Sequence, residues 1–287
     1  MRVQVGDVRL FFDVEGAGLV PDGPWMRPRP TILLLHPGPG FDHALYKVLL
    51  GPRLAPLGQV VYLDQRGNGR SDTSPRERLT LETWADDVRA FCDALAIERP
   101  VVLGHGFGAL VAAAYAARHP EHPRRLVLVN GGTRVVPGRS VAVYERLGGA
   151  AAGEAAKMFY DQPNERTFAV FMRHAYPHTT SYGTAEAATR ATWNPDVLIH
   201  WRRYAPGGFD LRGRLGTVRA PTLLLAGEDD PELTPAGSTE LLQALPEGIA
   251  RLRTFPKARH GVFRDAPGAL DELLAFLAEP DQEAGAG

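Results

Sequence analysis

The chain of 287 residues contains 44% hydrophobic and 23% charged residues, a balance typical of globular proteins and unlike that of disordered ones. Its 32 basic and 33 acidic residues leave a formal net charge of -1, so no overall field attracts nucleic acid or an anionic membrane. The single cysteine, Cys92, excludes intrachain disulfides and multi-cysteine metal sites. No apolar run is long enough for a membrane helix and the start does not resemble a signal peptide, so we expect a cytoplasmic protein.

The first hundred residues contain several predicted strands. Residues 3–14 alternate polar and apolar residues, which predicts a strand pair, and a Pro/Gly-rich loop follows. Three short apolar runs then predict buried strands, each ending in a glycine-rich turn: residues 31–35, 60–63 and 101–103. A further strand is predicted at residues 126–129.

Helices are predicted between these strands. Trp84, Val88, Phe91 and Leu95 follow helical spacing, with Thr80 as the expected N-cap. The alanine-rich segment 109–118 is apolar nearly all round, as in a helix buried against a sheet. Apolar strands alternating with helices predict an α/β protein, with a mostly parallel sheet, helices on both faces and ligands at the carboxyl ends of the strands.

The middle of the chain differs from both ends. Strand patterns disappear between residues 133 and 212, where aromatic residues and histidines occur among short helical segments, and we expect a helical cap (lid) there. The sheet pattern returns afterwards, with strands at 221–226 and 251–255 and helices near 236–245 and 267–278. We therefore predict one core from residues 1–132 and 213–287.

The segment Gly104-His105-Gly106-Phe107-Gly108 follows a predicted strand and precedes a helix, which is the setting of a nucleophile elbow. The attacking residue stands in the middle of the G-x-S-x-G pattern, and here that position holds Gly106. The alternative is a glycine-rich turn that cradles a phosphate or only packs closely. None of the five serines lies at the elbow: Ser71, Ser74, Ser140, Ser181 and Ser238.

An acid and a histidine follow the two late strands. Asp230, with Asp229 as a fallback, comes after the strand at 221–226, and His260 comes after the last strand. Taken alone, Asp230 could equally be a turn or N-cap aspartate, and a histidine such as His260 is more often a surface-loop residue. Together with position 106 they have the order nucleophile, acid, base that the α/β-hydrolase fold imposes. We expect the three positions to meet.

The turn His36-Pro37-Gly38-Pro39-Gly40 is a candidate oxyanion loop. Proline has no amide hydrogen, so among residues 37–39 only Gly38 can donate, and we expect it to act with the amide of Phe107. A rigid structural turn is the alternative. The candidate substrate-binding residues are His36, His105, Trp193 and Trp201. This scheme requires no metal and no organic cofactor.

These motifs resemble those of α/β-hydrolases of the proline iminopeptidase type. The resemblance rests on residues 36–40 for the family's HGGPG, residues 64–71 for its DQRGxGRS, the elbow, and the late Asp and His. It implies an α/β-hydrolase fold and a Ser-His-Asp hydrolase that removes N-terminal proline from peptides, while relatives with these loops hydrolyse esters, lactones or amides. The chain departs from the family at Gly106, and its cap lacks the Trp-Glu segment that helps hold the substrate's amine.

Three functional interpretations therefore stay open. The first is a proline iminopeptidase-like enzyme in an inactive Ser-to-Gly form at position 106, whether engineered or natural. The second is a small ester, lactone or amide hydrolase, and the third is a ligand-binding protein without catalysis. Each takes a small molecule or short peptide as its partner and involves neither nucleic acid nor membrane, and the oligomeric state is open.

Overall fold

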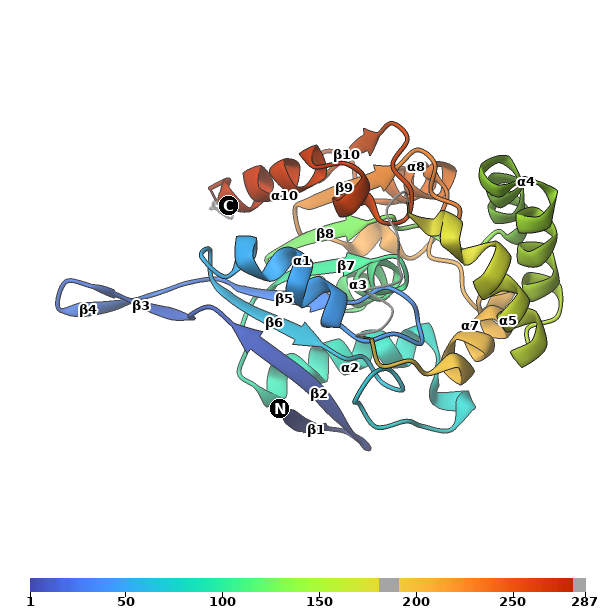
Figure 1. The fold of residues 1–287 in the computed structure, drawn as a ribbon. Helices are drawn as coiled ribbons and strands as arrows, with labels where there is room; N and C mark the ends of the chain where they lie inside the picture. Colours follow the sequence, from blue (N-terminus) through green and yellow to red (C-terminus); the bar gives the residue numbers. More distant parts are fainter. Residues whose placement is uncertain (181–190, 281–287) are drawn as a thin grey trace.

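The computed structural model describes residues 1–180 and 191–280. Eight strands form one sheet in the order β1-β2-β6-β5-β7-β8-β9-β10 (Figure 1). Their bounds are β1 (Arg2–Val5), β2 (Val8–Glu15), β5 (Thr31–Leu35), β6 (Gln59–Leu63), β7 (Val101–His105), β8 (Arg125–Val129), β9 (Thr222–Gly227) and β10 (Ala250–Phe255). Strands β1, β2 and β6 pair in antiparallel fashion, and all other pairs are parallel. The predicted mostly parallel sheet is confirmed.

Helices cover both faces of this sheet, also as predicted. The bounds are α1 (Ala44–Leu54), α2 (Leu81–Ala94), α3 (Phe107–Arg118), α8 (Pro235–Ala244), α9 (Val262–Asp265) and α10 (Gly268–Ala278). Alternate strand residues serve opposite faces: Leu33 and Leu35 pack with α2 and α3, whereas Ile32 and Leu34 pack with α1 and α10. This alternation explains why the central strands are apolar throughout.

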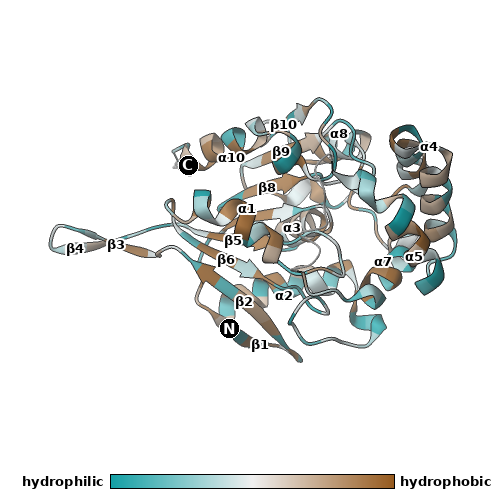
Figure 2. Cartoon of the chain, viewed as in Figure 1, coloured by the Kyte–Doolittle hydropathy of each residue, from teal (hydrophilic) through white to brown (hydrophobic). Residues whose placement is uncertain are grey.

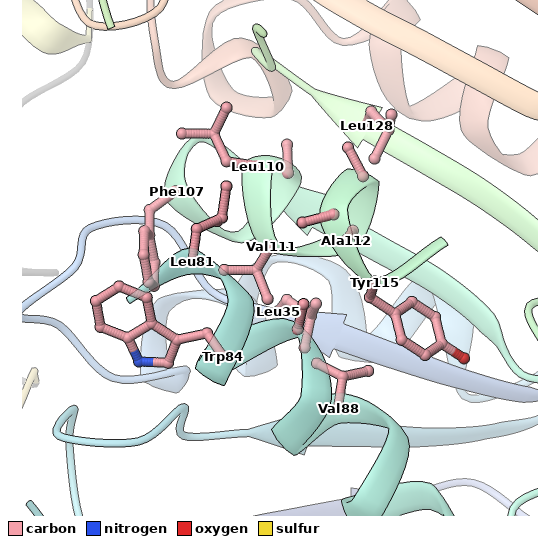
Figure 3. Packing of buried hydrophobic residues seen from close by; sticks show 14 of the residues in the cluster. Leu35, Leu81, Trp84, Val88, Phe107, Leu110, Val111, Ala112, Tyr115 and Leu128 are labelled. Atoms are coloured by element: carbon pink, nitrogen blue, oxygen red, sulfur yellow. The ribbon is translucent and has the colours of Figure 1, made fainter. Parts of the chain in front are cut away.

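The core beneath α3 is dense with apolar side chains. Trp84 of α2 meets Phe107 of α3 edge-on with ring centroids 4.8 Å apart, and Leu110 and Val111 extend the contact along α3 (Figure 3). The hydropathy colouring shows apolar residues concentrated on central strands such as β5 and β8 (Figure 2). Thr80 caps α2 as predicted, since its hydroxyl accepts a hydrogen bond from the Thr83 amide at 3.2 Å.

Several elements differ from the sequence-based expectation, and the short helix α9 is one of them. The loop predicted after residue 14 contains a hairpin of β3 (Leu19–Asp22) and β4 (Trp25–Pro28), which pairs only with itself and projects from the body (Figure 1). Its side chains are largely exposed, so no burial pattern marked it. Helix α1 was also not predicted, because the glycines and prolines around it obscured its apolar face.

Helices between β8 and β9 lie beyond the carboxyl ends of the parallel strands (Figure 1). They are α4 (Pro137–Asp161), α5 (Glu165–His174) and α7 (Pro195–Gly208), with 3-10 turns at Tyr176–Thr179 here and at Arg76–Arg78 and Leu215–Thr217 in the core. No strand occurs among the described residues of this stretch. The limits 133 and 212 of the cap stay a prediction. Within the described ranges, no helix has the length and apolarity to cross a membrane.

Candidate active site

Gly106 forms the turn between β7 and α3, with φ 55° and ψ -114°. Its amide donates to the carbonyl of Val129 at 2.9 Å, which ties the turn to β8. A Cβ at Gly104 would lie 2.2 Å from the carbonyl oxygen of Gly108, and a Cβ at Gly108 would lie 2.2 Å from that of Leu35. Any side chain at these flanking positions would clash with backbone, so the turn requires glycine on both sides.

The structure brings His260 and Asp230 to this turn. Nδ1 of His260 lies 2.9 Å from Oδ2 of the fully buried Asp230, whose Oδ1 accepts from the Glu232 amide at 2.8 Å. On the other side of the ring, Nε2 lies 2.7 Å from the position of an ideal Cβ on Gly106. The imidazole thus stands between the carboxylate and the vacant side-chain position. Asp229 instead pairs with Arg146 at 2.8 Å.

Asn130 holds the histidine loop in place, and sequence reasoning did not identify it. Its Nδ2 donates to the carbonyl oxygens of His260 at 2.8 Å and Arg259 at 3.2 Å, while its Oδ1 accepts from the Gly227 amide at 2.8 Å. One side chain therefore joins the ends of β8, β9 and β10. Its position directly after a buried strand, at the edge where the other site residues lie, was the available signal.

The electrostatic environment separates His260 from its neighbour His105. Burial disfavours the charged form of His260, but the adjacent Asp230 carboxylate outweighs it and raises the His260 pKa above its ordinary value. Burial lowers the pKa of His105 well below its ordinary value. The two rings lie 4.6 Å apart between centroids, so a neutral His105 packs against the ring of a more basic His260.

The two candidate oxyanion donors lie at the carboxyl edge of the sheet, where they follow β5 and β7. Gly38 lines the pocket and has φ 126°, and a Cβ there would lie 2.9 Å from the Phe41 ring. Phe107 is the first residue of α3, where backbone amides have no acceptor within the helix. Neither amide takes part in a hydrogen bond within residues 1–180 and 191–280. Both therefore retain a hydrogen for a ligand oxygen, and their joint role stays a prediction.

His36 lies in the protein interior behind the pocket. Its Nδ1 donates to the Pro37 carbonyl at 2.7 Å and its Nε2 accepts from the Gln65 amide at 3.1 Å. Burial lowers its pKa, so the ring is neutral with a fixed tautomer. His36 is not among the pocket-lining residues and joins the loops after β5 and β6 instead of facing a substrate.

The Asp-Gln-Arg-Gly segment, residues 64–67, stabilises the adjacent loops through internal hydrogen bonds and ion pairs. Arg66 is buried and donates two hydrogen bonds to Asp87 of α2, both at 2.7 Å. Asp64, which has no exposed surface, accepts from the Nδ1 of His43 at 2.6 Å and from the Arg70 amide at 2.9 Å. These internal pairings give the segment a structural role.

A pocket of about 110 Å³ opens beside the His260 ring, between the strand ends and helices α5 and α7. Aromatic side chains form much of its wall, including Trp193, whose ring centroid lies 4.2 Å from that of Phe41. His105 also lines the pocket. Trp201, the other predicted aromatic contact, packs against Phe107 and Trp84 in the core and does not line it.

The two carboxylates that line this pocket already have partners. Asp42 lies 3.3 Å from the Arg70 guanidinium and accepts from the backbone amides of Ala44 and Thr192, both at 3.0 Å. Glu232 forms an ion pair with Arg202 at 2.5 Å and also accepts a hydrogen bond from Tyr144. The described residues contain no cluster of three His, Cys, Asp or Glu side chains that could hold a metal ion.

Comparisons with known proteins agree with this architecture. Residues 30–267 match the family described as alpha/beta hydrolase fold. The chain is 29% identical over 286 residues to a putative carbamate hydrolase, RutD, of Azorhizobium caulinodans, covering 96% of this chain and 98% of that one. It is 26% identical over 284 residues to a proline iminopeptidase of Lactobacillus helveticus, with 88% and 89% covered.

A solved structure, the proline iminopeptidase-related protein of Thermus thermophilus, superposes with a TM-score of 0.70 at 26% identity, covering 96% of this chain and 95% of that one. The sequence family covers most of the chain, and the eight-stranded sheet has the mostly parallel direction that the sequence patterns predicted. The chain therefore belongs to the alpha/beta hydrolase fold family.

Proposed function

We propose that this chain is a serine-type hydrolase of small acyl substrates in which glycine occupies the position of the attacking serine. One observation carries the proposal: His260 bonds to Asp230 through Nδ1 and directs Nε2 to within 2.7 Å of the Cβ position of residue 106. This is the connectivity of a nucleophile, base and acid. With Gly106 the attacking oxygen is missing, so we expect no hydrolysis by this route.

The roles follow from the chemistry of acyl transfer. A serine hydroxyl at position 106 would attack the substrate carbonyl while His260 takes its proton, and His260 would then deliver that proton to the leaving group. Water would release the acyl group by the same steps. Asp230 would stabilise the imidazolium, and the amides of Gly38 and Phe107 would stabilise the negative carbonyl oxygen.

The pocket favours small acyl substrates over peptides with N-terminal proline. A buried ammonium group requires an available carboxylate, but Asp42 and Glu232 are both engaged with arginines. Its volume of about 110 Å³ is well below the roughly 300 to 1,000 Å³ of sites for drug-sized ligands. We therefore place esters, lactones and small amides or carbamates ahead of proline peptides.

A second candidate is a protein that binds a ligand without hydrolysing it. The observation in its favour is the short distance at the elbow, since a Cβ at position 106 would lie 2.7 Å from Nε2 and 2.8 Å from Cε1 of His260. Real Cβ atoms do not approach a neighbour this closely, so the ring must withdraw slightly before any side chain fits. The close approach of the His260 ring therefore fits a native glycine at position 106.

The deciding experiment is Gly106→Ser, assayed with p-nitrophenyl acetate and butyrate and with proline p-nitroanilide. We expect ester hydrolysis at least about 100-fold above that of the parent chain, since the base and the oxyanion donors are already present. Gly106→Ala is the matched control, because it adds the same Cβ without the hydroxyl and should stay inactive.

Each other outcome has a definite meaning. A folded Gly106→Ser variant that is inert against the whole panel contradicts the hydrolase proposal and leaves the ligand-binding function. Faster hydrolysis of the proline anilide than of either ester restores the iminopeptidase interpretation.

A further inference from the structure

Two carboxylates and two arginines line the pocket, but they do not pair one to one with each other. Of its two carboxylates, Asp42 is paired with Arg70 and Glu232 with Arg202. The two arginines of the wall are Arg202 and Arg264. The side chain of Arg264 forms no hydrogen bond or ion pair with any described residue. One arginine of the pocket wall therefore has no ion-pair partner among the described residues.

Arg264 is held close to the proposed catalytic base. It lies in α9, the short helix that begins two residues after His260. A Cβ at Gly261 would lie 3.0 Å from Nη2 of Arg264 and 2.7 Å from the Thr180 hydroxyl. The absence of a side chain at Gly261 thus lets the guanidinium lie against the backbone directly beside His260.

The neighbouring acid, Asp265, compensates this charge only in part. Asp265 accepts hydrogen bonds from the Thr180 hydroxyl at 2.9 Å and from the Arg259 amide at 2.8 Å. Burial lowers the pKa of Arg264, with Tyr176 and Asp265 opposing the shift only in part. Arginine stays charged under such conditions. A partly desolvated guanidinium without an ion-pair partner is stabilised when an anion binds.

We infer that Arg264 selects substrates that carry a carboxylate, which it binds while the substrate carbonyl lies beside position 106. The planar guanidinium can donate two parallel hydrogen bonds to the two carboxylate oxygens. The aromatic wall would then enclose the carbon chain that joins this carboxylate to the substrate carbonyl. This substrate class rests on the proposed hydrolase function. The carboxylate belongs either to the acyl chain or to the leaving group, and the assays below separate these two sources.

Binding to the parent chain tests the inference without any chemistry. Calorimetry with glutarate and with its neutral analogue glutaramide should show a preference for the carboxylate. Arg264→Gln should weaken glutarate binding about 10- to 100-fold, the range for hydrogen bonds to charged groups. Arg264→Lys should retain part of it, and Arg253→Gln, which removes a positive charge on β10 outside the pocket, should leave it unchanged. Equal binding of glutarate by Arg264→Gln and the parent, or no binding by the parent at millimolar concentration, overturns the inference.

Kinetics in the Gly106→Ser background provide a second readout. The mono-p-nitrophenyl ester of glutaric acid is compared with p-nitrophenyl valerate for the acyl chain, and 3-acetoxybenzoate with phenyl acetate for the leaving group. Adding Arg264→Gln should lower kcat/KM about 10- to 100-fold for one carboxylate ester and leave its neutral partner within about twofold.

The two proposals fail in different ways. If the Gly106→Ser chain hydrolyses neutral esters but shows no Arg264-dependent preference, the carboxylate inference fails alone. If that chain is inert while glutarate binding still depends on Arg264, the hydrolase proposal fails and the anion site remains.

Discussion

Two regions meet at the pocket: the rim, which is the carboxyl edge of the sheet with Gly106, Asp230 and His260, and the roof, which consists of helices α4, α5 and α7. The loop after β9 contributes a carboxylate to each of them. Asp230 and Glu232 are two residues apart after β9, yet Asp230 bonds to His260 of the rim and Glu232 bonds to Arg202 and Tyr144 of the roof. Burial opposes ionisation of Glu232, but Arg202 outweighs it and lowers the Glu232 pKa. A single short segment thus holds the His260 ring on one side and anchors the roof on the other.

The largest effect is expected at the rim. In the Gly106→Ser background, His260→Ala should lower kcat/KM for p-nitrophenyl butyrate by at least about 1,000-fold, because no other group takes the serine proton. His174→Ala, which removes an exposed histidine of α5, is the control and should change little. Activity retained by the His260→Ala variant would show that the rim does not perform the chemistry.

The next effect concerns the roof and is one of stability. Glu232→Gln leaves the buried Arg202 without its counter-charge and should lower the free energy of unfolding by about 3–5 kcal/mol, as measured by urea denaturation. Glu272→Gln, at a partly exposed pair with Arg253, should change it by at most about 1 kcal/mol. Equal effects of the two variants would show that the pair does not anchor the roof.

A smaller stability change is expected at the elbow itself. Gly106→Ser places a side chain at φ 55° and against the His260 ring, so unfolding should become easier by about 1–3 kcal/mol. Gly138→Ser is the matched control, since no heavy atom lies within 4 Å of its Cβ position and its φ is not positive. A variant as stable as the parent would mean that the rim accepts the side chain without strain.

The smallest predicted effect is a shift in pH dependence. Only neutral His260 accepts a proton, so kcat/KM of the Gly106→Ser variant should fall about tenfold per pH unit below the His260 pKa. That pKa is raised above 6.5 by the Asp230 carboxylate, against the opposing effect of burial. Adding Asp230→Asn removes the raising charge and should move the acidic limb of the profile to lower pH. A limb that stays in place or moves upward would contradict the proposed pairing.

The amino-acid sequence determined the framework of the sheet and the positions at which its loops meet. Apolar runs and glycine-rich turns are local features, and parallel strands bring their carboxyl ends to one edge, so Gly106, Asp230 and His260 could be expected together. The mostly parallel direction of the sheet followed from the same alternation of strands and helices, whereas the order of its strands came only from the structure. The hairpin of β3 and β4 was not predicted, because exposed strands show no alternation of buried and exposed residues.

Only the tertiary structure decided which side chains reach the pocket. Trp193 and Trp201 are equivalent as sequence signals, yet one lines the pocket and the other packs on Phe107 in the core. The pairing of Glu232 with Arg202, and the lack of such a partner for Arg264 within the described chain, are likewise invisible in the sequence. Each depends on contacts between segments far apart along the chain, and local periodicity carries no information about which of them meet.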